Sequence, residues 1–167
     1  MFFRKANQED MPAMMLLIGQ AQAFLSHLQI NQWQNGYPSQ EIVEQDIRDG
    51  NAWILEDSTA LIAMVVVSFD VEPTYLQIYD GAWLTQGNYA VIHRLTVDDR
   101  RKGQGIGALL FEKMETLIRE KKTPSIRVDT HQDNFVMRKL LTKLGYHYCG
   151  EILLEDGQPR LAYEKVI

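Results

Sequence analysis

Hydrophobic and polar positions divide the chain into helix-like and strand-like segments. Apolar residues recur every three or four positions in four segments, which is the spacing of one helix face. Alternating or continuous apolar runs between turn residues mark seven strand-like segments. The expected helices cover residues 11–28, 39–50, 105–120 and 134–145, and the expected strands cover 1–6, 51–57, 60–69, 89–97, 125–130, 146–154 and 160–167.

In chain order these segments run β-α-α-β-β-β-α-β-α-β-β, which predicts a mixed α/β fold. Residues 70–88 fit neither pattern, and we expect them to form a long hairpin or a loop over a binding face. No internal repeat, linker or low-complexity tract divides the chain. We therefore expect residues 1–167 to form a single domain.

The composition narrows the classes of partner. Hydrophobic residues make up 46% of the 167 residues and charged ones 23%, which argues against disorder. The net charge of −5 disfavours non-specific binding to nucleic acid or to an anionic membrane. Cys149 is the sole cysteine and the four histidines lack metal-ligand spacing, so neither a disulfide nor a metal site is expected. With no signal peptide or membrane span, the sequence predicts a cytoplasmic protein.

The stretch "VDDRRKGQGIGALL", residues 97–110, joins an expected strand to an expected helix. Free backbone N–H groups and the positive end of a helix dipole meet at such a turn, which makes it an anion site. Glycines at 103, 105 and 107 would let the backbone approach a phosphate, and Arg100, Arg101 and Lys102 would add positive charge. A glycine-rich connection with no ligand is the plain structural alternative.

A dinucleotide-binding fold is one specific interpretation of this turn. Gly103, Gly105 and Ala108 fit G-x-G-x-x-A, and Asp129 ends the next strand, where a ribose-binding acid belongs. The context disagrees, because "DDRRK" separates the strand from the first glycine and too few residues follow Asp129 for the remaining units. A P-loop is excluded, since G-x-x-x-x-G-K-[ST] does not occur.

The run "LTVDDRRKGQGIGALL" resembles the acetyl-CoA signature of the GCN5-related N-acetyltransferase (GNAT) family. Lys102 holds the Gln/Arg position, Gly105 the first glycine and Gly107 the Gly/Ala position. A second run, "DNFVMRKLLTKLGY", is similar to the family's N-x-x-A-x-x-L-Y-x-x-x-G-F, although Leu141 replaces the tyrosine. The resemblance covers nearly the whole chain and implies a GNAT-like fold, with a central, mostly antiparallel mixed sheet flanked by helices.

The resemblance implies acetyl-CoA as cosubstrate and the groups that hold it. Backbone amides of residues 102–107 would bind the pyrophosphate, backbone groups of the preceding strand would pair with the pantetheine arm, and an asparagine would contact the cofactor. The implied residues are Leu95, Thr96, Val97, Lys102, Gly103, Gln104, Gly105, Ile106, Gly107 and Asn134. Arg100, Arg101, Arg138 and Lys143 are further candidates for the adenosine phosphate, or solvated surface charges.

The reaction implied is attack of a primary amine, on a small molecule or on a peptide or protein, at the thioester. His93 is the candidate general base: it shares one strand face with Val91 and Leu95, arylalkylamine acetyltransferases carry a histidine at the matching place, and its ordinary pKa suits proton transfer near neutrality. A structural histidine is the alternative. With Leu141 at the tyrosine position, Tyr146 and Tyr148 are weak candidates for the general acid, and water is another.

Acceptor recognition is expected from the first two helices and residues 70–88. These regions are rich in aromatic residues and acids, which suits a pocket for a small amine, although core aromatics and solvated acids are the plainer interpretation. Trp33 and Tyr37, in "QWQNGYPS", are the first candidates. The other residues considered are Trp53, Tyr75, Tyr79, Trp83, Glu41, Glu44, Asp46, Asp70, Glu72 and Asp80. A non-catalytic acyl-CoA-binding module remains the alternative function, and family members are often homodimers.

Overall fold

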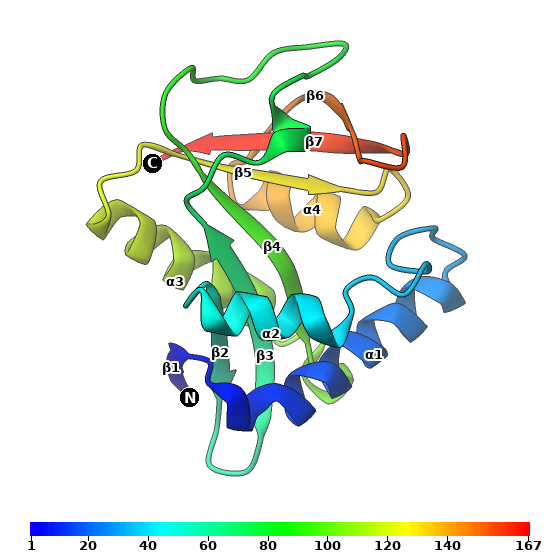
Figure 1. Cartoon of the computed structure of the whole chain (residues 1–167), viewed down its shortest axis with the longest axis vertical. Coiled ribbons are helices and arrows are strands. Elements are labelled where there is room, and N and C mark those ends of the chain that lie inside the picture. Colours follow the sequence, from blue (N-terminus) through cyan, green and yellow to red (C-terminus); the bar gives the residue numbers. More distant parts are fainter. The chain divides into compact units, whose positions relative to one another are not determined.

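The computed structural model describes residues 1–167, with seven strands and four α-helices in the order that the sequence predicts (Figure 1). The strands are β1 (Phe2–Lys5), β2 (Ala52–Glu56), β3 (Leu61–Ser68), β4 (Ala90–Val97), β5 (Ser125–Thr130), β6 (His147–Leu153) and β7 (Pro159–Val166). The helices are α1 (Met11–His27), α2 (Gln40–Arg48), α3 (Ile106–Glu120) and α4 (Phe135–Lys143). Three short 3₁₀ turns are η1 (Gln8–Asp10), η2 (Pro73–Tyr75) and η3 (Asp99–Arg101).

The strands form one mixed sheet in the order β1-β2-β3-β4-β5-β7-β6. β2 pairs antiparallel with β1 and β3, and β7 pairs antiparallel with β5 and β6. β4 pairs with β5 in parallel, at Ala90↔Ile126 and Val91↔Arg127. The predicted α/β class with a mostly antiparallel mixed sheet is therefore confirmed, and the parallel sheet of a dinucleotide-binding fold is excluded.

The chain divides into two compact units. The first contains residues 1–67 and 93–111, and the second contains residues 68–92 and 112–167. β4 begins in the second unit and ends in the first, and α3 begins in the first and ends in the second. That residues 1–167 form a single domain stays a prediction.

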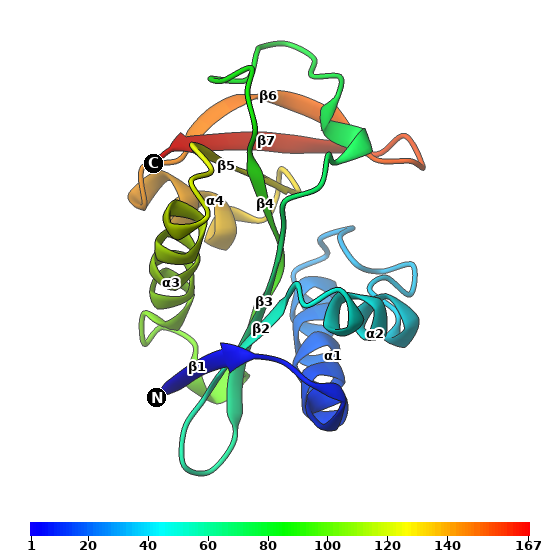
Figure 2. The same ribbon diagram turned by 60° about the vertical axis from the view of Figure 1, so that its left-hand side comes forward.

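In the first unit, α1 and α2 cover one face of β2 and β3 (Figure 2). Met14, Leu17 and Ile18 of α1 pack with apolar residues of α2 and of the two strands, and all three are buried. The start of α1 is fixed by a capping box in which Asn7 and Asp10 exchange side-chain and backbone hydrogen bonds over η1. The helix therefore begins where the sequence predicts it.

In the second unit, residues 70–88 lie on one face of β5, β7 and β6, and α4 lies on the other (Figure 2). These residues do not form the long hairpin that was one of the two expectations; they form a loop containing η2, held to β6 by a single bridge at Tyr79↔Glu151. The loop approaches β6 so closely that a Cβ on Gly81 would lie 2.0 Å from the carbonyl oxygen of Cys149. Glycine is therefore required at position 81.

The length and hydrophobicity of the four helices can be compared with those of a membrane-spanning helix. None of them combines the length and the apolar character that crossing a bilayer requires.

Candidate cofactor site

The turn after β4 is a short connection to α3 with several internal hydrogen bonds. The Asp98 side chain accepts a 2.9 Å hydrogen bond from the Arg100 N–H and so caps η3. The Asp98 N–H in turn donates to the Ile62 carbonyl of β3 at 2.9 Å. A capped turn anchored to the neighbouring strand has little freedom, so its geometry is set before any ligand arrives.

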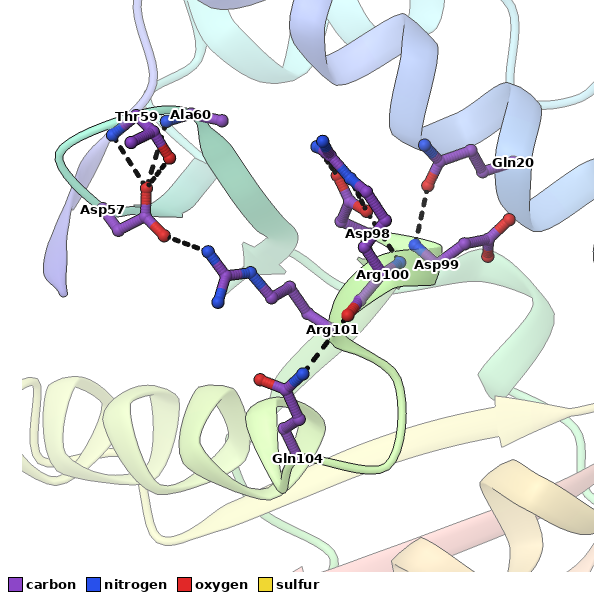
Figure 3. A network of polar contacts seen from close by, with 9 residues as sticks. All are labelled: Gln20, Asp57, Thr59, Ala60, Asp98, Asp99, Arg100, Arg101 and Gln104. Atoms are coloured by element: carbon purple, nitrogen blue, oxygen red, sulfur yellow. Dashed lines mark hydrogen bonds and ion pairs between the residues drawn. The ribbon is translucent and has the colours of Figure 1, made fainter.

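Side chains on either side of the turn also hold it (Figure 3). Gln20 of α1 accepts a 3.0 Å hydrogen bond from the Asp99 N–H. Arg101 donates to Asp57, whose other carboxylate oxygen accepts from the Thr59 and Ala60 N–H groups in the turn between β2 and β3. The turn is thus tied to α1 and to the β2–β3 turn.

The basic residues of the turn are paired with acids. Three ion pairs join Arg100 to Asp98, Arg101 to Asp57 and Lys102 to Asp99. Each of these charges is therefore balanced by a neighbouring carboxylate, and the expectation that they add positive charge for an anion stays a prediction. What the turn offers to an anion is its backbone.

The glycines of the turn present that backbone to open space. Gly103 and Gly105 have φ angles of 77° and 80°, in the left-handed region that favours glycine. A Cβ built on either one would meet no atom within 4 Å. Conformation, not crowding by the protein, requires glycine here, and the space above both residues can admit a ligand.

The first turn of α3 adds hydrogen-bond donors. The first intrahelical bond runs from the Leu109 N–H to the Gly105 carbonyl, at 3.0 Å. The N–H groups of residues 106–108 therefore precede the helix ladder, as at any helix N-terminus. With the helix dipole behind them, these donors suit a phosphate group.

β4 is irregular just before this turn. Arg94 has a φ of 51°, which costs a non-glycine residue roughly 1–2 kcal/mol in a strand. A left-handed residue interrupts the alternation of side chains, so the expected single face shared by Val91, His93 and Leu95 does not continue regularly through residue 94. Two residues further on, the hydroxyl of Thr96 is buried without a hydrogen-bond partner.

The side chain of Arg94 enters a buried cluster. Its Nε and Nη2 atoms donate to the two carboxylate oxygens of Asp46, at 2.8 and 2.6 Å, and its Nη1 donates to the Tyr37 hydroxyl at 2.5 Å. The Trp33 ring meets the Tyr37 ring edge-on, with 6.4 Å between centroids. The predicted acceptor residues Trp33 and Tyr37 therefore lie together, and Tyr37 reaches the expected cofactor strand.

His93 lies next to Arg94 and is half-buried. Burial, together with the Arg94 charge, lowers the pKa of His93 to about 3. The expectation that its pKa suits proton transfer near neutrality is wrong: the imidazole stays neutral at physiological pH and is a weak base there.

The two tyrosines considered as acids are poorly suited to the role. Burial, followed by the nearby Glu115 carboxylate, raises the pKa of Tyr146 well above its usual value. Tyr148 is 53% exposed and packs edge-on against Tyr163. Leu141, at the family's tyrosine position, is fully buried. A raised pKa weakens a proton donor, so the structure supplies no strong side-chain acid among these residues.

Asn134 has a clear local role. Its side-chain oxygen accepts a 3.2 Å hydrogen bond from the Met137 N–H and so caps α4. Because this cap uses only the oxygen, the predicted contact between Asn134 and the cofactor is still compatible with it. Among the two candidates on α4 for the adenosine phosphate, Arg138 donates to the Gln132 carbonyl at 2.7 Å.

Most of the other aromatic residues considered for the acceptor have structural contacts. Trp53 stacks on Phe3 at the β1–β2 pair, with 5.2 Å between centroids. Tyr75 is buried, and its hydroxyl donates to Asp129 at 2.7 Å. Of the acids, Asp46 is bound to Arg94, so it does not offer a free charge to a cationic amine.

Sequence reasoning missed Arg94, although a signal was present. A charged residue within the apolar run "AVIHRLTV" needs a partner if its strand is buried. Asp46 lies between Val43 and Ile47 on the apolar face of α2, where a carboxylate has the same need. Two charges of opposite sign on buried faces indicate a pair, but the sequence does not show that the two faces meet.

Comparison with known proteins gives consistent results. The model of the acetyltransferase (GNAT) family matches residues 22–146. The uncharacterized N-acetyltransferase YesJ of Bacillus subtilis (strain 168) is 27% identical over 124 residues, which cover 72% of this chain and 67% of that protein.

Solved structures agree. A GNAT family acetyltransferase from Streptococcus agalactiae 2603 superposes with a TM-score of 0.88 and 35% identity, over 99% of this chain and 95% of that one. A ribosomal-protein-alanine N-acetyltransferase from Brucella melitensis has the same fold, with a TM-score of 0.69 and 18% identity over 100% of both chains. The GNAT-like fold expected from the sequence is confirmed.

Proposed function

The chain belongs to the GNAT acetyltransferase family, and on that premise we propose that it transfers an acetyl group from acetyl-CoA to a primary amine by direct attack in a ternary complex. The family implies acyl transfer from acetyl-CoA. The observation that carries the proposal for this chain is the glycine turn: Gly103 and Gly105 face open space, beside the unpaired N–H groups that begin α3.

The residues present fit this cosubstrate. In the proposal, backbone amides of residues 102–107 hold the diphosphate, and backbone groups of Leu95 and Val97 hold the pantetheine arm. The buried Thr96 hydroxyl, which has no partner in the protein, is a further group that a ligand would satisfy. Acetyl-CoA supplies a thioester carbonyl that a neutral amine can attack.

The chain has two tasks during transfer. It must donate a hydrogen bond to the carbonyl oxygen as negative charge develops there, and a backbone N–H near Val97 is proposed for this. It must also help the amine, whose pKa is roughly 10, to lose its protons. The bond from nitrogen to the acetyl carbon forms, the carbon–sulfur bond breaks, and the thiolate takes up a proton, for which water is proposed.

His93 has a narrower role in this scheme than the sequence indicates. With a pKa of about 3 it does not take a proton from a free ammonium group, but the neutral imidazole can accept a hydrogen bond from the attacking amine. Its own titration therefore lies far below neutrality. We expect His93→Gln to lower kcat without changing the shape of the pH–rate profile between pH 6 and 9, where the rate should rise steadily with the fraction of free amine. A midpoint within this range that is present in the wild type and absent from the variant would restore His93 as the titrating base.

The acceptor is proposed only by class. The Brucella protein is a ribosomal-protein-alanine N-acetyltransferase, and both a peptide amino group and a small-molecule amine are proposed as acceptors. Trp33 and Tyr37 are proposed to contact the acceptor, because they lie together beside Arg94 of β4. Cytoplasmic location and a homodimer stay predictions.

One observation favours a second function, a non-catalytic acyl-CoA-binding module. The position of the family's tyrosine is held by Leu141, which is fully buried and cannot donate a proton. A chain that kept the cofactor turn and lost the acid would bind acetyl-CoA without transferring the acetyl group.

Two measurements decide between these functions. Titration calorimetry with acetyl-CoA tests binding, and thiol release with a panel of small amines and N-terminal peptides tests transfer. Binding with thiol release supports the transferase, whereas tight binding with no release for any amine favours the binding module. No heat of binding would contradict both.

A glycine variant with a matched control tests the turn itself. Gly105 and Gly157 both have a φ of 80° and open space at the Cβ position, but Gly157 lies in the turn between β6 and β7. Alanine at either position therefore meets the same backbone strain. We expect Gly105→Ala to weaken acetyl-CoA binding at least tenfold and Gly157→Ala to leave it unchanged. Equal affinities in the two variants would remove the turn from the binding site.

A further inference from the structure

We propose that Tyr37, Asp46 and Arg94 form a positioning cluster, which holds β4 in the irregular conformation that aims the peptide groups of residues 95–97. The inference rests on the proposed function, because these are the peptide groups proposed to hold the thioester end of acetyl-CoA. All three residues belong to the first unit. Tyr37 is also proposed to contact the acceptor, but none of the three residues is proposed to touch the reacting atoms, so the cluster positions the backbone and does not itself catalyse.

The backbone of β4 is left-handed at one residue. Arg94 has a φ of 51° within a strand that continues to Val97. A single left-handed residue changes the direction in which the following N–H and C=O groups point. The conformation of Arg94 therefore decides what residues 95–97 present to a ligand.

Arginine is an unfavourable residue for the left-handed conformation at position 94. Glycine adopts a left-handed conformation without strain, and asparagine or aspartate with little, but arginine gains nothing from it. Something in the structure must hold arginine there, and its guanidinium group is held at three nitrogen atoms. Two of them bind the two oxygens of Asp46 and the third binds the Tyr37 hydroxyl. This planar, bidentate arrangement fixes the orientation of the side chain, which a lysine cannot reproduce.

The two partners of Arg94, Asp46 and Tyr37, are themselves held in place by α2 and α1. Asp46 projects from α2, whose Val43 and Ile47 are buried in the core against α1 and the strands. The Tyr37 carbonyl accepts a 3.0 Å hydrogen bond from the Gln22 side chain of α1. Both partners of Arg94 are therefore fixed to the two helices, and the cluster transfers that rigidity to β4.

The cluster also explains why the chain has a carboxylate at Asp46, although that carboxylate is not free to bind a cationic acceptor. Asp46 and Arg94 are 10% and 12% exposed at their side chains and neutralise each other. A buried ion pair contributes little to stability relative to apolar residues of similar volume, so this pair is better explained by a geometry that it fixes. Here that geometry is the left-handed residue of the cofactor strand.

The principal test separates backbone geometry from stability. Both variants are made in the Asp46→Asn background, because replacing Arg94 alone would leave the Asp46 carboxylate buried without a partner. In this background Arg94→Gly and Arg94→Ala both delete the cluster, but only glycine adopts a positive φ freely. We expect the glycine double variant to retain a kcat at least tenfold higher than that of the alanine double variant. Their dissociation constants for acetyl-CoA should differ by a smaller factor than their kcat values, because the diphosphate turn is intact in both and only the contacts with the pantetheine arm change. Equal kcat values would overturn the proposal.

Single variants sharpen this result. Arg94→Lys should lower kcat at least tenfold and raise the KM for acetyl-CoA by a smaller factor, and Tyr37→Phe, which removes one of the three contacts, should have a smaller effect on kcat. Arg4→Lys is the matched control, because Arg4 also binds two carboxylates, Asp10 and Glu56, at a different place in the same unit. Its kcat should equal that of the wild type. A kcat for Arg94→Lys equal to that of the control would contradict the inference.

A readout without turnover keeps this inference separate from the proposed function. Hydrogen exchange followed by mass spectrometry reports on the N–H groups of residues 95–97 in the free protein. Exchange in the alanine double variant should be at least tenfold faster than in the glycine double variant. If the wild type transfers no acetyl group, the proposed function fails, and the exchange comparison alone decides the inference: equal rates overturn it.

Discussion

Two buried arginine–carboxylate pairs, one in each unit, differ in what surrounds the carboxylate. In the first unit, both oxygens of Asp46 are bound by Arg94 alone. In the second, Glu164 is fully buried and accepts hydrogen bonds from the N–H groups of Leu84 and Thr85 and from two hydroxyls, as well as from Arg127. One carboxylate depends on its arginine, and the other is satisfied largely by uncharged groups.

The pKa values follow this difference. Burial raises the pKa of Asp46, and the ion pair with Arg94 does not fully offset it. Burial also raises the pKa of Glu164, but the hydrogen bonds from Thr85, Ser125 and Leu84 and the charge of Arg127 together outweigh burial, and the net pKa lies below its ordinary value. The Glu164 cluster thus stabilises the fold by tying the loop at residues 84–85 to the sheet, whereas the Asp46 pair fixes a strand that is costly to hold.

The largest expected effect on stability comes from Glu164→Gln. The substitution places an amide among hydrogen-bond donors and leaves Arg127 buried without a counter-charge, beneath the rings of Trp83 and Tyr89. The free energy of unfolding should fall by about 3–5 kcal/mol in urea titrations. Glu155→Gln, at an exposed position, serves as the control and should change it by less than about 0.5 kcal/mol.

Asp46→Asn should cost less, about 1–3 kcal/mol, by the same measurement. The guanidinium of Arg94 keeps the Tyr37 hydroxyl as a partner, and its side chain is partly open to water, at 12% exposure. If Asp46→Asn lost as much stability as Glu164→Gln while its kcat stayed at the wild-type value, the proposed difference in role between the two pairs would be contradicted.

Ser125→Ala should have the smallest effect on stability, about 1 kcal/mol. It removes one donor, at 2.7 Å, from a carboxylate that retains several others. A loss above about 3 kcal/mol would show that the donors to Glu164 do not substitute for one another.

The two carboxylates should also respond to pH with opposite signs. The folded pKa of Glu164 is lowered, so its stabilisation is present above the ordinary value of 4.5 and is lost as the pH falls below it. The folded pKa of Asp46 is raised, so its contribution is greatest below 3.8 and declines as the pH rises through the folded value.

Urea titrations between pH 3 and 6 check these signs. The stability difference between wild type and Glu164→Gln should grow as the pH rises, and the difference between wild type and Asp46→Asn should shrink. Two slopes of the same sign would contradict the assignment of these pKa shifts.

The sequence predicts the regular elements well because periodicity and turn residues are local signals. The apolar positions from Ile106 to Ile118 define α3, and the glycine turn before it indicates an anion site without any tertiary information. The loop at residues 70–88 has no such signal, because its conformation depends on Glu164, on the last strand of the chain.

The misjudged parts of the site depend on contacts that hydrophobic periodicity does not reveal. Arg101 is balanced by Asp57 of a turn distant in sequence, whereas Asp98 and Asp99, which balance Arg100 and Lys102, lie beside them in the chain. The pKa of His93 depends on burial and on the Arg94 charge. The left-handed conformation of Arg94 is set by a contact with α2, which no local rule for a strand would predict.

The most direct test of the account is a crystal structure of the protein grown with saturating coenzyme A. The account predicts that the diphosphate oxygens lie within hydrogen-bond distance of the backbone nitrogens of residues 102–107, while Arg100 and Arg101 keep their carboxylate partners. A diphosphate bound elsewhere, or held by those arginine side chains in place of the backbone, would contradict it.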